Sequence, residues 1–342
     1  MANPALSRLG FGTSGLMGAA LTRSGRLRLL ETAFEQGIRH FDTAPLYGMG
    51  EAEEVLGRFA RSRRDQITIT TKFGLAPPAI PPLLRPAVPL ARALHRRIGK
   101  RFRPSLPVAF ASPSPAAPPA NAHQPSGDGA HPPAPANPAA GSQPYNLAAM
   151  RASLEASLRK LGCDCLDFFL LHEGQSQHLN AEVIATLEGF VQQGKIKCYG
   201  LGSGRGATWT VLSEWPAFRG VVQIPDHLLA MDTGWFASHA PAPLFTHSVL
   251  QTPLRSASLR PSLDRLLSRW AERTNQDPSR HDLMGEMLLA GGLLNNPDGC
   301  VVFSTRQPDR IRSSVGTLER LASVGQPLAD LLADERSAAA ST

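Results

Sequence analysis

The chain has 342 residues, and its apolar fraction of 42% suffices for a large core, which excludes a globally disordered protein. The net charge of +7 suggests a nucleic-acid partner, but residues 76–146 carry +6 of it and the rest only about +1. The folded part is therefore not a polycation, and we expect no nucleic-acid partner.

Membrane and export signals are missing from the sequence. No run of about 18 apolar residues indicates a membrane span, and the opening MANPALSRLG lacks a secretory pattern. The four cysteines form no metal knuckle, and His172-Glu173 lacks the second histidine of a zinc helix at Ser176. We therefore expect a cytoplasmic protein with free thiols and no metal. The sequence gives no sign of the oligomeric state.

Strand-like and helix-like segments alternate along the chain, which is typical of a parallel sheet with crossover helices. Strands are predicted at 7–11, 38–42, 67–72, 165–171, 196–201, 220–224, 244–247 and 300–304. Helices are predicted near 24–36, 50–61, 147–161, 181–193, 205–213, 228–240, 261–273, 281–291 and 308–321, the one near 228–240 from the weakest pattern. Ser24 and Asn146 fit helix N-caps, while Gly37, Gly162 and Gly194 fit helix ends. Eight strands with about as many helices predict a (β/α)8 TIM barrel.

The segment after the third strand breaks this alternation. From Pro104 to Pro144 it holds 12 of the 30 prolines, too little apolar surface to offset the entropy of ordering. We expect a disordered Pro/Ala-rich insertion, so the barrel comprises 1–75 and 147–325, the insertion 76–146, and a C-terminal tail 326–342. Within the insertion, residues 83–102 read as a basic amphipathic helix that could touch a membrane, pack on the barrel, or remain solvated.

Four polar residues stand where apolar strands end. Asp42 ends the second predicted strand, Tyr47 follows it, Lys72 ends the third and His172 follows the fourth. Strand ends of a barrel converge on one face, and neighbouring strands lie about 4.8 Å apart, so these side chains can meet. An ammonium group lowers the pKa of a nearby phenol, which suits proton transfer to a carbonyl oxygen.

The segments HFDTAPLYGMGEAEEVLG, TITTKFG, SLEASLRKLGCDCLDFFLLH and GKIKCYGLGS resemble, in this order, the aldo-keto reductases. The likeness covers most of residues 7–75 and 147–320. It implies that Tyr47 donates the proton, that Lys72 lowers the pKa of Tyr47, that Asp42 pairs with Lys72, and that His172 orients the substrate oxygen.

The resemblance also implies an NADP(H) site across the barrel top, with NAD(H) as the less favoured cofactor. After strand five this chain has Gly202-Ser203 where the family usually has Ser-Asn. On strand seven it has His247 where the family often has a tyrosine that stacks on the nicotinamide. Arg310 matches a phosphate-binding arginine, for which a helix N-terminus is favourable. The implied cofactor contacts are Gly12, Thr13, Ser14, Asp42, Ser203, Gln223, His247, Ser248, Ser304, Thr305, Arg306 and Arg310.

The sequence thus favours an oxidoreductase that interconverts a small carbonyl compound and its alcohol with NADP(H). Two alternatives stay open. The opening Leu9-Gly10-Phe11-Gly12-Thr13-Ser14-Gly15-Leu16 resembles NAD-dependent aldose dehydrogenases of the same family, and the altered positions 202, 203 and 247 would also suit a cofactor-bound sensor with little turnover. Gly202-x-Gly204-x-x-Ala207 is a weak dinucleotide fingerprint, which would need its own six-stranded sheet.

Overall fold

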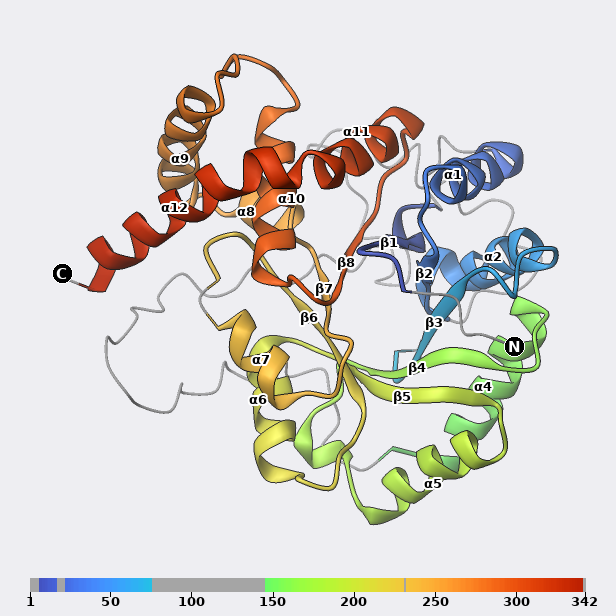
Figure 1. Ribbon diagram of the computed structural model, residues 1–342. Coiled ribbons are helices and arrows are strands. Elements are labelled where there is room, and N and C mark those ends of the chain that lie inside the picture. Colours follow the sequence, from blue (N-terminus) through green and yellow to red (C-terminus); the bar gives the residue numbers. More distant parts are fainter. Residues whose placement is uncertain (1–5, 17–21, 76–144, 231, 341–342) are drawn as a thin grey trace, which may run out of the picture.

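The computed structural model describes residues 6–16, 22–75, 145–230 and 232–340, and within these ranges it is a closed eight-stranded barrel (Figure 1). All neighbouring strands pair in parallel, and β8 closes the barrel on β1. The strands are β1 Leu9–Gly12, β2 His40–Asp42, β3 Thr68–Phe73, β4 Leu166–His172, β5 Ile196–Gly202, β6 Val221–Pro225, β7 Phe245–His247 and β8 Cys300–Phe303. The predicted barrel is confirmed, and each strand lies within two residues of its predicted bounds.

Helices surround the barrel, and those of its wall present apolar residues to the strands and polar residues outward. They are α1 Arg23–Glu35, α2 Ala52–Ala60, α4 Leu147–Leu161, α5 Ala181–Gln192, α6 Arg205–Glu214, α7 Thr233–His239, α8 Gln251–Arg255, α9 Arg260–Arg273, α10 Leu283–Asn295, α11 Pro308–Glu319 and α12 Leu321–Ala340. The short helix α8 was not predicted from the sequence.

Helix ends follow the expected capping chemistry with one exception. The Asn146 side chain accepts from the backbone N–H of Ala149, as predicted, whereas α1 is capped by Thr22 and not by Ser24. Thr22 accepts from the backbone N–H of Gly25, so Ser24 lies inside the helix. Gly162 ends α4 at φ 65°, a left-handed conformation that glycine adopts without strain.

Of the predicted insertion at 76–146, residues 76–144 lie outside the described part of the chain, whereas Tyr145 and Asn146 are described. Its two flanks are described and lie side by side. The ring of Phe73, the last residue of β3, is 5.3 Å from that of Tyr145, just before α4. When the two ends of a loop lie close together, lengthening the loop adds little to the free energy of folding, because the entropy of loop closure changes only logarithmically with length.

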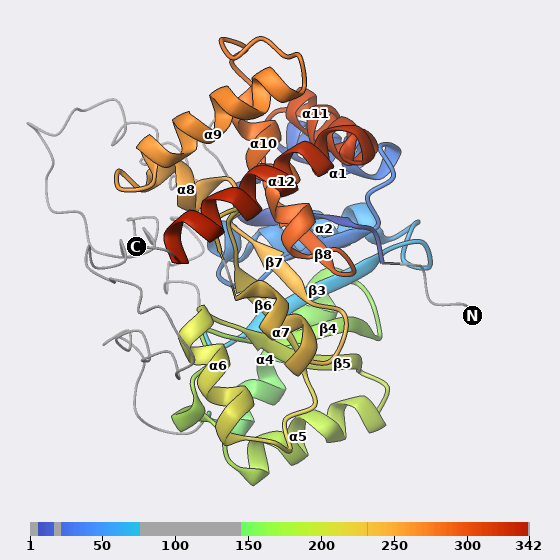
Figure 2. The same ribbon diagram turned by 60° about the vertical axis from the view of Figure 1, so that its left-hand side comes forward.

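The C-terminal segment differs from the prediction. The expected helix near 308–321 is two helices, and the expected tail from 326 is part of α12, which packs against α9 and α10 (Figures 1 and 2). Leu328, Leu331 and Leu332 are buried there with Trp270 in a second hydrophobic cluster beside the barrel. The sequence analysis did not predict this cluster, because the leucines of α12 pack against a helix, α9, that lies more than 50 residues earlier in the chain.

We predict that Leu331→Ala lowers the free energy of unfolding by about 2–5 kcal/mol, because Leu331 is fully buried in this second cluster. Denaturant titration measures the change. The matched control is Leu254→Ala, whose side chain is 48% exposed and should change stability by less than about 0.5 kcal/mol. Equal stability of Leu331→Ala and wild type would mean that α12 does not pack on the barrel in solution.

Candidate active site

The four polar strand-end residues of the sequence analysis meet at the carboxyl end of the barrel. The Lys72 ammonium is 2.6 Å from Asp42 Oδ1 and 3.4 Å from the Tyr47 hydroxyl oxygen. The rings of Tyr47 and His172 lie 6.0 Å apart, edge to face. Parallel register explains this meeting, since β2, β3 and β4 are neighbours and each ends at the same face.

Both residues of the buried Lys72–Asp42 ion pair form a further hydrogen bond. Lys72, 2% exposed, also donates to the Thr43 carbonyl oxygen at 3.0 Å, and Gln223 Nε2 donates to Asp42 Oδ1 at 3.0 Å. Burial acts to lower the pKa of Lys72, but the Asp42 carboxylate and the hydrogen bonds outweigh burial, so the net pKa is raised. Lys72 is therefore a permanent cation at neutral pH.

Tyr47 does not follow the simple expectation of a lowered pKa. Burial raises the pKa of its phenol and outweighs Lys72, whose charge and hydrogen bond act to lower it. The cation therefore offsets part of the burial effect. Tyr47 is a protonated phenol at neutral pH, the form in which it can donate a proton.

His172 is a neutral imidazole in this environment. Burial and the neighbouring Lys72 lower its pKa to about 3. Its Nδ1 is buried without a hydrogen-bond partner in the described part of the chain. A neutral imidazole that lines the cleft can form a hydrogen bond to a substrate oxygen.

These residues line one cleft at the carboxyl end of the barrel. All four candidate catalytic residues reach this cleft. Of the expected cofactor contacts it also includes Gly12, Ser14, Gln223, His247, Ser248 and Ser304. The sequence analysis missed Glu173, Val249, Leu250, Gln251, Val302 and Phe303.

Two expected contacts point elsewhere. Thr13 is fully buried and its hydroxyl bonds to the Thr43 hydroxyl at 2.9 Å. Ser203 is 2% exposed and donates to the Gly174 carbonyl oxygen at 2.8 Å. Both hydroxyls are therefore used to hold loops together, and neither lines the cleft.

The expected phosphate contacts lie outside the cleft, after β8. Thr305 Oγ1 accepts from the Gln307 backbone N–H at 3.2 Å. Arg306 and Arg310 are exposed beside the first turn of α11, and no side-chain partner of either is found among the described residues. Two unpaired guanidinium groups at a helix N-terminus suit an anion.

Two cleft residues have left-handed backbones, Glu173 at φ 52° and Ser248 at φ 63°. Each directly follows a histidine at a strand end, His172 of β4 and His247 of β7. Such conformations cost about 1–3 kcal/mol outside glycine and are concentrated at functional sites. Burial also lowers the pKa of His247, to about 4, so the second histidine is neutral as well.

Two further findings concern the described residues alone. Among them no three His, Cys, Asp or Glu side chains are grouped so as to hold a metal ion. None of their helices is long and apolar enough to cross a membrane.

Comparison with known proteins places the chain in a family. The Aldo/keto reductase family model matches residues 8–214, more than half of the chain, so the chain belongs to this family. Pyridoxal 4-dehydrogenase from Microbacterium luteolum is 41% identical over 71 residues, 20% of this chain and 21% of that protein. D-threo-aldose 1-dehydrogenase from a Pseudomonas species is 28% identical over 205 residues, 58% of this chain and 50% of that protein. The chain thus matches only about a fifth to a half of these relatives.

Solved structures share the fold over almost the whole chain. A glycerol dehydrogenase from Gluconobacter oxydans superposes with a TM-score of 0.61 at 16% identity, covering 97% of this chain and 93% of that one. An aldo-keto reductase from Klebsiella pneumoniae in complex with NADPH superposes with a TM-score of 0.56 at 19% identity, covering 95% of both chains. At such identities the likeness concerns the fold alone.

The neutral buried histidines predict a pH dependence of stability. His172 and His247, with pKa values of about 3 and 4, stay neutral in the folded chain, whereas the unfolded chain protonates them below about pH 6.5. The free energy of unfolding should therefore fall from pH 6.5 to 4, by up to about 1.4 kcal/mol per pH unit for each histidine. Denaturant unfolding at several pH values should give a shallower fall for His172→Gln. Identical slopes would mean that His172 is protonated in the folded chain.

Proposed function

We propose that this chain is an NADP(H)-dependent oxidoreductase that interconverts a small carbonyl compound and its alcohol. The observation that carries the proposal is the buried Lys72 ammonium, which contacts both Asp42 at 2.6 Å and the Tyr47 hydroxyl at 3.4 Å. A phenol that could donate a proton then lies beside a fixed cation in one cleft, which supports the proposal. Catalysis by a positioned acid of this kind typically contributes about 10²–10⁴-fold.

The residues around the cleft fit a dinucleotide. When bound, the nicotinamide would supply the hydride that reduces the carbonyl carbon. Gly12 and Gly202 leave the cleft floor open. A Cβ on Gly202 would lie 3.4 Å from Gln223 Oε1 and 3.7 Å from Lys72 Cε, both in the cleft. Gln223, His247 and Ser248 would then hold the nicotinamide end.

Proton transfer follows from the polar network. In the reducing direction Tyr47 donates its phenolic proton to the oxygen that becomes the alcohol. The Lys72 cation stabilises the phenolate that is left, and Asp42 with Gln223 holds Lys72 in place. His172, a neutral imidazole that lines the cleft, orients the same oxygen. In the oxidising direction the phenolate takes the proton back.

The phosphate end favours NADP(H) over NAD(H). Arg306 and Arg310 are exposed cations without partners in the described part of the chain, at the start of α11. A 2′-phosphate is the group that distinguishes the two cofactors, and guanidinium groups bind phosphate in a bidentate manner.

An aldose dehydrogenase remains the second candidate, since the D-threo-aldose 1-dehydrogenase match spans 205 residues. It uses the same proton-transfer residues in the oxidising direction, so oxidation of free aldoses with NAD+ and NADP+ distinguishes it. A sensor with little turnover is less well supported, because the Asp42, Tyr47, Lys72 and His172 arrangement is complete. Cytoplasmic localisation stays a prediction.

We predict that Tyr47→Phe lowers the rate of aldehyde reduction by about 100-fold or more, because only the proton donor is lost. Steady-state kinetics with NADPH measures the rate, and fluorescence titration should show nearly normal NADPH binding. Tyr199→Phe is the control, since Tyr199 lies outside the cleft lining and its hydroxyl accepts from the Arg219 backbone N–H at 3.4 Å. Activity of Tyr47→Phe within a few-fold of wild type would refute the assignment.

We also predict that Arg310→Ala weakens NADPH binding by about 10–150-fold while changing NADH binding little. The reason is the loss of charge-assisted hydrogen bonds, worth about 1.5–3 kcal/mol. Fluorescence titration with both cofactors measures this difference. Arg312→Ala is the matched control on the same helix, because Arg312 is already paired with Asp309 at 2.8 Å. Equal weakening of both cofactors would show that Arg310 does not contact the 2′-phosphate.

A further inference from the structure

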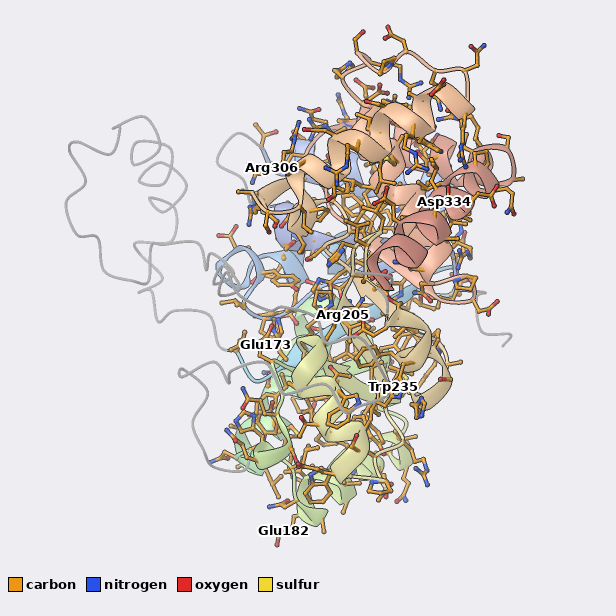
Figure 3. All side chains as sticks on the ribbon, turned by 90° about the vertical axis from the view of Figure 1, so that its left-hand side faces the viewer. Glu173, Glu182, Arg205, Trp235, Arg306 and Asp334 are labelled. Atoms are coloured by element: carbon orange, nitrogen blue, oxygen red, sulfur yellow. The ribbon has the colours of Figure 1, made fainter. Side chains whose placement is uncertain are left out.

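Arg205 is the first residue of α6, and it is not among the residues that line the cleft. Its side chain is only 21% exposed and forms ion pairs with Asp226, which is buried, and with Asp232. Figure 3 shows Arg205 toward the middle of the molecule, whereas Glu182 of α5 stands at the outer edge. Arg205 is therefore a fixed internal cation and not an ordinary surface arginine.

The guanidinium group of Arg205 binds the end of β6 and the start of α7 at the same time. Its Nε donates to the Pro225 carbonyl oxygen at 2.9 Å. One terminal nitrogen donates to Asp226 Oδ1 at 2.6 Å and to Thr233 Oγ1 at 2.8 Å, and the other binds Asp232. A guanidinium group can hold several acceptors at once because its donors point in fixed directions, which the ammonium group of a lysine does not match.

One peptide unit links Arg205 to the proposed nicotinamide site. The carbonyl group of Pro225 and the N–H group of Asp226 belong to the same planar unit. The carbonyl oxygen accepts from Arg205, while the N–H donates to the His247 carbonyl oxygen at 2.8 Å. Ser248 comes next, with a left-handed backbone at φ 63°, and like His247 it lines the cleft. The position of this peptide unit therefore determines how β7 presents both cleft residues.

Arg205 also supports the proposed nicotinamide contact on β6. Gln223 lies two residues before Pro225, and its carbonyl oxygen accepts from the Ser203 backbone N–H at 3.1 Å. The bond from Arg205 to Pro225 is a second link between the same two strand ends. Together the two links fix where Gln223 stands relative to Gly202, its neighbour on β5.

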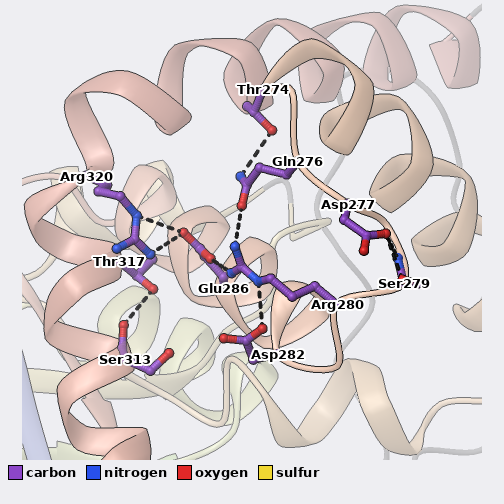
Figure 4. Close-up of polar contacts among 10 residues, drawn as sticks. All are labelled: Thr274, Gln276, Asp277, Ser279, Arg280, Asp282, Glu286, Ser313, Thr317 and Arg320. Carbon is purple, nitrogen blue, oxygen red and sulfur yellow. Dashed lines mark hydrogen bonds and ion pairs between the residues drawn. The ribbon is translucent and has the colours of Figure 1, made fainter.

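Other buried acids of the chain are also held by arginine, but away from the cleft. Glu286, for example, is bound by Arg280 and by Arg320, the latter at 2.6 Å (Figure 4). Those bonds connect α10 to the segments beside it. The bonds of Arg205 instead end on a strand whose neighbours in the barrel carry cleft residues, so their loss reaches the site.

We propose that Arg205 is a positioning residue for the nicotinamide end of the cofactor. It touches neither the cofactor nor the substrate. It holds the end of β6 so that Gln223, His247 and Ser248 contact the nicotinamide together, as a supporting residue does for the residues that bind a ligand directly. This inference rests on the proposed oxidoreductase function and adds a residue to its cofactor site.

The test compares two ligands, of which only one carries the nicotinamide. NADP+ carries it, whereas adenosine 2′,5′-bisphosphate keeps only the adenosine with its phosphates. Arg205→Met should weaken NADP+ binding by about 5–30-fold, and Arg205→Lys, which cannot form all the bonds of the planar group, by at least about threefold. Both variants should bind the bisphosphate within about twofold of wild type, because β8 and the α11 that follows it are not neighbours of β5. Isothermal titration calorimetry measures all these affinities.

Arg219→Met is the matched control for loss of an arginine. Arg219 is exposed and lies just before β6, at the opposite end of that strand, so its loss should leave both affinities at the wild-type value. Thermal unfolding shows whether each variant folds. Arg205→Met leaves the buried Asp226 without its closest cation, so Arg205→Lys, which keeps the charge, decides the question if the methionine variant does not fold.

The possible outcomes separate the two proposals. Unchanged NADP+ affinity of folded Arg205→Lys, or equal weakening of NADP+ and of the bisphosphate, would overturn the positioning role while leaving the oxidoreductase function in place. A wild type that binds neither NADP+ nor NAD+ would overturn the proposed function itself. For a wild type that binds only NAD+, the same comparison is made between NAD+ and ADP.

Discussion

The arrangement of the site depends on one buried ion pair, Lys72 with Asp42. Burying two charges is costly, and a pair compensates for this only when its geometry is good and its remaining polar atoms are bonded. Here the distance is 2.6 Å, and the Thr43 carbonyl and the Gln223 amide satisfy what remains. Because Asp42 and Lys72 stand on neighbouring strands, the barrel itself fixes this distance. The ammonium is then available to the Tyr47 hydroxyl, which lies in the loop that follows β2.

The titration behaviour of the cleft follows from the same pair. Lys72 stays charged, and that charge helps burial to keep His172 neutral while it opposes the effect of burial on Tyr47. A protonated phenol, a neutral imidazole and a fixed cation thus occupy one small volume. Glu173 adds the only carboxylate of the lining besides Asp42 in the described part of the chain.

The family model matches the first part of the chain, whereas part of the proposed cofactor site lies in the rest. The family model ends at residue 214, yet His247, Ser248 and the start of α11 lie beyond it. In this later part the chain places three helices between β7 and β8 and continues α11 into α12. The second hydrophobic cluster and the bonds of Glu286 tie these helices to one another beside the barrel (Figure 4). The cofactor end of the proposed site thus lies outside the residues that the family model matches.

The sequence by itself determined the barrel and the position of its candidate catalytic residues. Strand and helix periodicity is local, and a polar residue such as Asp42 or His172 at the end of an apolar run must lie at the shared face of a parallel barrel. The sequence does not show which hydrogen-bond or packing partner, distant along the chain, each side chain contacts. Ser203 was expected at the cofactor but bonds to Gly174, and the leucines of α12 are buried only because α9 and α10 pack against them. Partner choice and desolvation are set by atoms far apart in the chain, so only the tertiary structure decided that burial raises the pKa of Tyr47 and that Gln223 bonds to Asp42.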